Sequence, residues 1–322
     1  MINISRAKAA DKLPLTLGMP QSLSPTPPLP PAIPAERREL ATAAGRLSLY
    51  SAGPEGAGAG LPPLLLVHSV NAAASAAEVA PLFAHYRQQR PVYALELPGF
   101  GFSDRSARSY TPRLMTDALH AAIAMIQAEH GGAPVDVVAV SLAGEFAARA
   151  KCEAPHSIRR LALVSPTGFR GAKLRYGPAG GTRGVPWLYR LFTWDGWRQG
   201  IFNTLTRPGV VRYFLQRTWG SNNIDEALWR YCVLTARQPG AANAPFYFVS
   251  AFLFSADINT LYEALGGPVW VSMATRGDFT DYQGRHTVAG RANWQFQAVD
   301  GGALPFFEDL AGFTDRLDPF WA

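Results

Sequence analysis

The chain has 322 residues, of which 48% are hydrophobic and 17% are charged, and its formal net charge is +6 at pH 7. This composition is ordinary for a globular protein, and the length allows one large domain or a core with an insertion. No apolar run approaches the about 18 residues of a membrane span. The two cysteines, Cys152 and Cys232, form neither a disulfide framework nor a metal-binding pattern.

The N-terminal segment, residues 1–35, is expected to be an arm outside the core. It contains the tract Pro25-Thr26-Pro27-Pro28-Leu29-Pro30-Pro31, which favours an extended polyproline conformation and cannot join the interior of a sheet. A surface-draped or mobile arm is the main interpretation, and a docking site for a proline-binding partner is the alternative. The segment lacks the apolar stretch of a secretory signal, so we expect a cytoplasmic location.

From about residue 36, apolar strands and helices alternate. This pattern predicts a mostly parallel, doubly wound α/β sheet with both faces covered. The expected strands are 47–51, 64–68, 92–97, 135–140, 161–164, 269–273 and 294–299, and the expected helices are 76–89, 111–129 and 142–152. The pattern divides the chain into a core, residues 36–166 and 267–322, and an insertion, residues 167–266.

The insertion is expected to be a helical, aromatic lid that carries the net charge of the protein. It contains 11 basic residues (Lys and Arg) and 5 acidic residues (Asp and Glu). The remainder of the chain contains 19 basic and 19 acidic residues, so its net charge is zero. The cations are dispersed, which argues against nucleic acid. They indicate either arginines that cover apolar surface with their stems, or a lid that attracts an anionic amphiphile or an anionic membrane surface.

One serine stands at a strand-to-helix corner. The β-branched run 135–140 leads directly through Ser141 into the Ala- and Glu-rich segment that begins at Leu142. Such a sharp turn requires small residues two positions away on each side, and these are Ala139 and Ala143. This is the arrangement of a G-x-S-x-G nucleophile elbow with both glycines replaced by alanine.

Four motifs in order make residues 36–322 resemble the α/β-hydrolase superfamily. They are His68-Ser69-Val70-Asn71 after an apolar strand, the loop Leu97-Pro98-Gly99-Phe100-Gly101-Phe102-Ser103-Asp104, the elbow at Ser141, and Thr275-Arg276-Gly277-Asp278 after the next-to-last strand. The resemblance implies an α/β-hydrolase fold with a lid and no metal or other cofactor. It implies that Ser141 is the nucleophile, that the amides of Val70 and Leu142 form the oxyanion hole, and that Asp278 orients a histidine.

The histidine itself is missing from its expected place. The family pattern Gly-His-x-Pro-x-x-Glu corresponds here to Gly302-Ala303-Leu304-Pro305-Phe306-Phe307-Glu308, which puts Ala303 at the histidine position. His68 ends the strand expected beside the serine strand, so it is the nearest possible substitute base. Loss of a triad member commonly costs a factor of about 10⁴ in rate.

Three functions fit this pattern. The first is a serine hydrolase-like enzyme that acts on an ester, thioester or lactone with a bulky apolar or amphiphilic group, through Ser141 and a non-standard base. The second is a non-catalytic ligand-binding or receptor-like protein that has lost the histidine. The third is a cofactor-free lyase or cyclase whose substrate supplies its own base. The substrate identity and the oligomeric state do not follow from the sequence.

Overall fold

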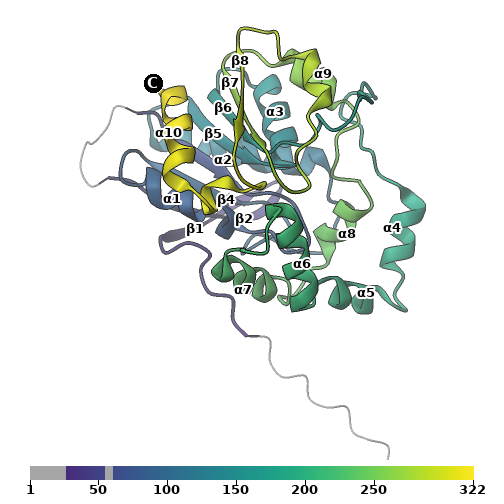
Figure 1. The fold of residues 1–322 in the computed structure, drawn as a ribbon. Coiled ribbons are helices and arrows are strands. Elements are labelled where there is room, and N and C mark those ends of the chain that lie inside the picture. Colours follow the sequence, from purple (N-terminus) through teal and green to yellow (C-terminus); the bar gives the residue numbers. More distant parts are fainter. Residues whose placement is uncertain (1–26, 55–60) are drawn as a thin grey trace, which may run out of the picture.

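A computed structural model describes residues 27–54 and 61–322, which form an eight-stranded sheet covered by helices (Figure 1). The strand order is β1-β2-β4-β3-β5-β6-β7-β8; the first two pairings are antiparallel and the others are parallel. The strands are β1 (Glu36–Thr42), β2 (Gly45–Ala52), β3 (Leu64–Val67), β4 (Val92–Glu96), β5 (Val135–Val140), β6 (Ile158–Val164), β7 (Val269–Ala274) and β8 (Trp294–Val299).

Apolar side chains alternate between two cores, one on each face of this sheet. One face packs against α2 (Pro112–Glu129), α3 (Ala143–Glu153) and α9 (Ile258–Ala264). The other packs against η1 (Ala76–Val79), α1 (Ala80–Tyr86) and α10 (Leu310–Trp321), together with η3 (Pro305–Phe307). Figure 1 shows α1 and α10 on the face opposite α2 and α3. The doubly wound, mostly parallel sheet expected from the sequence is therefore confirmed.

Between β6 and β7 the chain leaves the sheet and folds into helices. They are α4 (Pro186–Thr193), α5 (Arg198–Leu205), α6 (Pro208–Trp219), α7 (Glu226–Thr235) and α8 (Asn243–Val249), after which α9 returns to pack on α3. A short 3₁₀ helix, η2 (Gln283–Thr287), follows β7. In Figure 1 the helices α4 to α8 lie together at one end of the sheet, with α4 at the outer edge.

A strand, β1, and an α-helix, α10, are among the elements that were not expected from the sequence. β1 reads Glu-Arg-Arg-Glu-Leu-Ala-Thr and has no apolar run, because it is an edge strand that pairs only with β2 and keeps charged side chains in solvent. α10 contains Pro319, a residue that discourages a helix prediction, yet the helix is held by the buried side chains of Phe313, Leu317 and Trp321.

The described part of the N-terminal arm, residues 27–35, lies on the folded protein. The Tyr231 hydroxyl donates to the Pro30 carbonyl at 2.9 Å, and the Ala32 amide donates to the Tyr50 hydroxyl at 2.9 Å. Ile33 is buried. This part matches a draped arm; the rest of the expected arm, 1–26, lies outside the described residues.

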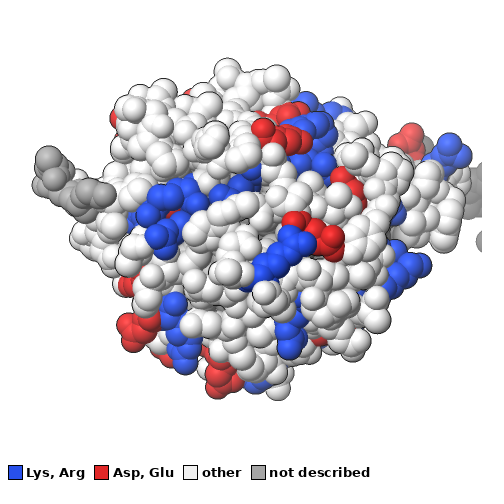
Figure 2. Space-filling view, turned by 90° about the horizontal axis from the view of Figure 1, so that it is seen from above, with Lys and Arg blue, Asp and Glu red and all other residues white. Residues whose placement is uncertain are grey.

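The surface carries scattered charge. Viewed from above, Figure 2 shows Lys and Arg side chains separated by wide uncharged areas, with Asp and Glu beside several of them. No helix in the described ranges is long and apolar enough to cross a membrane.

Candidate active site

Ser141 occupies the corner between β5 and α3. Its φ angle is +53°, in the left-handed region that a residue with a Cβ rarely adopts. The amide of Ser141 donates to the carbonyl of Val164 in the adjacent strand at 2.8 Å, and the flanking Ala139 and Ala143 are fully buried. A strained non-glycine residue costs on the order of 1–3 kcal/mol and persists where its surroundings enforce it, often at a functional site.

Two buried amides adjoin this corner. Val70 follows β3, which pairs with β5 in register Val67↔Ala139, and Leu142 is the residue after the serine. Within residues 27–54 and 61–322, neither amide donates a hydrogen bond to another protein group. A buried amide without an acceptor is uncommon, so both are available to an oxygen atom of a ligand.

Glu78 in η1 holds the loop that carries Val70. Its carboxylate accepts from the Ser69 amide at 2.8 Å and from the Asn71 side-chain amide at 2.7 Å. Burial raises the pKa of Glu78, and the hydrogen bonds to this loop oppose that rise. Sequence reasoning missed this residue, because an isolated glutamate at the start of a helix carries no signal of a contact nine positions away.

His68 is fully buried, and both of its ring nitrogens bond to the backbone. Nε2 accepts from the Leu97 amide at 3.0 Å, and Nδ1 lies 2.6 Å from the Ser69 carbonyl, to which it donates. Burial lowers the pKa of His68 to about 4. Neither nitrogen is left to accept a proton from Ser141, so the sequence-based suggestion of His68 as a substitute base does not fit this geometry.

Asp278 follows β7 as expected, but its carboxylate binds an arginine. Arg217, in α6, donates through Nε to Oδ2 at 2.9 Å and through a terminal nitrogen to Oδ1 at 2.6 Å. The Asp278 amide also donates to the Arg217 carbonyl at 3.2 Å. Hydrogen bonding to Asp278 raises the pKa of Arg217. The carboxylate is therefore paired with the insertion and with no histidine.

Ala303 contacts the C-terminal end of α6, the helix that carries Arg217. Its amide donates to the Thr218 carbonyl at 3.0 Å, and its side chain is buried. The next helical residue, Trp219, is 1% exposed and stands against Phe307, with 5.7 Å between ring centroids. The end of α6 thus contacts both loops to which the family resemblance assigns the acid and the histidine.

The histidines other than His68 bond to groups unrelated to Ser141 or Asp278, or are exposed. His85 lies 3.6 Å from Asp318, His120 lies 2.9 Å from Glu153, and His130 lies 2.8 Å from the Tyr93 hydroxyl. His156 and His286 are exposed. Among the residues that the structure describes, no cluster of His, Cys, Asp or Glu could hold a metal ion.

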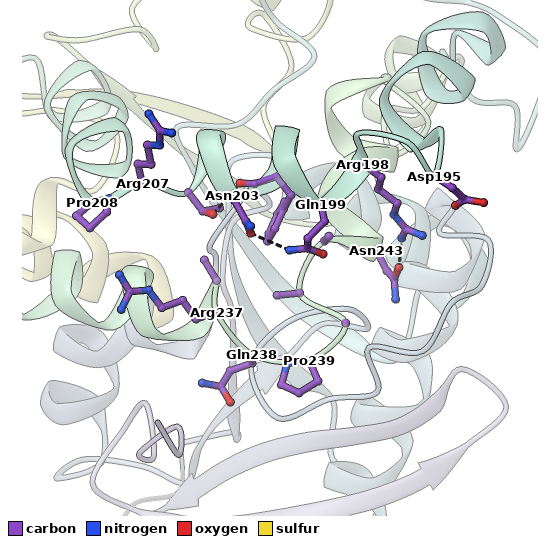
Figure 3. A pocket seen from close by; sticks show the side chains of 16 residues that line it. Asp195, Arg198, Gln199, Asn203, Arg207, Pro208, Arg237, Gln238, Pro239 and Asn243 are labelled. Carbon is purple, nitrogen blue, oxygen red and sulfur yellow. Dashed lines mark hydrogen bonds between the residues drawn. The ribbon is translucent and has the colours of Figure 1, made fainter. Parts of the chain in front are cut away.

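Two cavities are described, and Ser141 lines neither. The first, about 650 Å³, lies within the insertion between α5 and the turn from α7 to α8. Figure 3 shows the amides of Gln199 and Asn203 in contact along its wall, at 2.8 Å. The second, about 700 Å³, lies between this turn, the arm and the loop 101–107.

Comparison with known proteins agrees with this architecture. The model of the alpha/beta hydrolase fold family matches residues 62–212, which include the Val70 loop and the Ser141 corner. The chain therefore has the α/β-hydrolase fold. No curated protein sequence matches it at a significant level.

Solved structures share the fold at low identity. Cfl2 from Burkholderia cenocepacia is 20% identical with a TM-score of 0.68, over 89% of this chain and 95% of that one. An enol-lactonase from Burkholderia xenovorans LB400 is 16% identical with a TM-score of 0.66, over 88% and 99%. A membrane phospholipase A described as a bacterial virulence factor is 18% identical with a TM-score of 0.66, over 88% and 85%.

Proposed function

We propose that this protein is a serine hydrolase-like enzyme that cleaves an ester, thioester or lactone bearing a bulky apolar or amphiphilic group. Ser141 is the nucleophile, and the Val70 and Leu142 amides stabilise the oxyanion of the tetrahedral intermediate. The observation that carries the proposal is the strained φ of +53° at Ser141, together with two amides of buried residues, Val70 and Leu142, that find no acceptor among the described residues. Similar structures that are named as a lactonase, an esterase and a phospholipase support the reaction class.

The proposed enzyme reacts slowly with simple esters. No histidine hydrogen-bonds to Ser141 within the described residues, and hydroxide or a group of the substrate must accept the serine proton. An oxyanion hole and substrate binding without a triad base retain about 10³–10⁴-fold acceleration over water.

The test is labelling by a fluorophosphonate, which reacts with an activated serine. We expect slow labelling that Ser141→Ala abolishes, and slow p-nitrophenyl ester hydrolysis that disappears in the same variant. Ser165→Ala is a matched control, since Ser165 also has a positive φ of +46° at the end of a strand. Labelling that survives Ser141→Ala would refute the assignment.

A non-catalytic ligand-binding protein is the second candidate. The Arg217 pairing of Asp278 and the packing of α6 over Ala303 favour it, since both occupy places that a working triad needs. Complete inertness of Ser141 in the labelling experiment would select this function.

A further inference from the structure

The outermost part of the insertion is a hairpin of two helices, residues 186–205, with large apolar side chains in solvent. No residue of α4 is buried. One side of α4 packs on α8, where the Tyr189 and Tyr247 ring centroids are 4.4 Å apart. The other side is open: Trp187 is 66% exposed, and Trp194 is 58% exposed. Figure 1 shows α4 at the edge of the molecule, away from the sheet.

These exposed side chains form one face. Trp187 and Leu191 lie four positions apart on one side of α4, and Trp194 is the first residue beyond the end of this helix. Trp197 extends the face, because its ring stands against that of Trp194 with 4.3 Å between centroids and its Nε1 donates to the Leu191 carbonyl at 2.6 Å. We call these four residues the tryptophan face. A contiguous exposed apolar patch of this kind marks an interaction surface more often than a lone exposed residue does.

The part of the insertion around this face is predominantly basic. Residues 170–224 contain nine Lys and Arg and a single acid, Asp195. Arg212 and Arg217 are paired with Glu226 and Asp278. Arg190 in α4 is exposed and has no carboxylate within ion-pair distance in the described ranges, whereas Arg198 at the start of α5 donates to the side chain of Asn243. The tryptophan face is therefore bordered by Arg190, a cation that no carboxylate of residues 27–54 and 61–322 pairs with.

Indole rings beside arginines suit the boundary between lipid headgroups and acyl chains. An amphipathic helix with Trp and Leu on one side and arginine at its border lies in this boundary and is attracted to anionic lipid. We propose that the tryptophan face docks the protein on the surface of an anionic phospholipid bilayer, with Trp187 and Trp194 inserted at headgroup level. Docking does not depend on chemistry at Ser141.

The proposal is tested by co-sedimentation with phosphatidylcholine vesicles that contain or lack phosphatidylglycerol. We expect binding only to the anionic vesicles, weakening as salt rises because the attraction is screened over about 8–10 Å at physiological ionic strength. Trp187→Ala with Trp194→Ala should weaken binding about tenfold or more, since two indoles lose their burial. Arg190→Gln should weaken it severalfold.

Two control variants distinguish binding by the tryptophan face from nonspecific hydrophobic adsorption and from catalysis. Tyr213→Ala with Phe214→Ala removes another exposed aromatic pair, each 52% exposed on α6, and should leave binding unchanged. Ser141→Ala should bind vesicles as tightly as the natural protein. The vesicle experiment therefore tests membrane docking even if Ser141 proves not to be a nucleophile. Equal binding to neutral vesicles, no binding at low salt, or no effect of the tryptophan substitutions would each overturn the proposal. Self-association in the absence of vesicles would also overturn it if the tryptophan substitutions abolish that association. The tryptophan face would then bind a second copy of the chain.

Discussion

At the residue scale, the pairing of Asp278 decides what this carboxylate can do. Its carboxylate lies after β7, but both oxygens accept from Arg217. A carboxylate held in this way is not free to orient an imidazole at position 303. The same helix supplies the carbonyl of Thr218 that binds the Ala303 amide.

The first prediction combines these two positions. Ala303→His alone should raise p-nitrophenyl ester hydrolysis by less than about tenfold, because Arg217 still occupies Asp278. Ala303→His with Arg217→Gln should raise it about 10²-fold, the gain typical of a positioned general base. Steady-state kinetics measures both, and Ser141→Ala in the double variant should remove the gain. A full gain in the single variant would show that Asp278 has no orienting role, and no gain in either would show that residue 303 does not face Ser141.

At the scale of elements, the end of α6 is held against the core by close backbone approaches. A Cβ built on Gly302 would lie 2.4 Å from the Trp219 Cα, and one on Gly277 would lie 2.6 Å from the Thr218 carbonyl oxygen. These contacts need glycine because the atoms it meets belong to the backbone and cannot rotate away. The insertion is thus attached to the core next to the candidate active site.

The second prediction uses this contact. Gly302→Ala should lower the free energy of unfolding by about 1–3 kcal/mol, the usual cost of overpacking, because α6 must shift to admit the methyl group. Urea denaturation followed by tryptophan fluorescence measures the change. Gly290→Ala is the matched control, since a Cβ there meets no atom within 4 Å and should alter stability by less than about 0.5 kcal/mol. Equal stability of the two variants would contradict the close packing of α6.

At the scale of the whole molecule, buried titratable groups make stability depend on pH. Burial lowers the pKa of His68 from 6.5 to about 4, so the folded protein keeps this ring neutral where the unfolded chain protonates it. Because the unfolded chain takes up this proton first, the free energy of unfolding is highest above pH 6.5 and decreases as the pH falls from 6.5 toward 4. Burial raises the pKa of Glu96 to about 7, so its contribution runs the opposite way, present at low pH and lost as pH rises through 7.

The third prediction isolates the histidine. His68→Gln keeps a donor and an acceptor for Ser69 and Leu97 but cannot titrate. Between pH 7 and pH 4 the natural protein should lose about 3 kcal/mol more stability than the variant, since one pKa unit corresponds to about 1.4 kcal/mol. Urea denaturation at several pH values gives this difference, in which the Glu96 contribution cancels. Parallel pH profiles for the two proteins would mean that His68 is not held neutral.

Local sequence patterns determined most of the secondary structure and the Ser141 corner. The strands 135–140 and 294–299 were predicted with their observed bounds. The first is a mostly apolar, fully buried run, which is typical of a central parallel strand. The corner was predictable because only Ser141 and Leu142 separate the buried strand β5 from the helix α3, which forces a sharp turn at the serine. The charged edge strand β1 and the proline-containing α10 were missed, because pairing and packing rather than local composition stabilise them.

Only the tertiary structure decided which partners the candidate site residues have. Arg217 meets Asp278 across 61 positions, and His68 meets Leu97 across 29. Contacts over such separations depend on how helices pack onto the sheet, which no local pattern encodes. The sequence by itself therefore determined the strand-to-helix corner at Ser141, because that turn depends on neighbouring residues. The packing of α6 on the loops after β7 and β8 determined that Asp278 binds Arg217, because this contact joins parts of the chain that only the tertiary structure brings together.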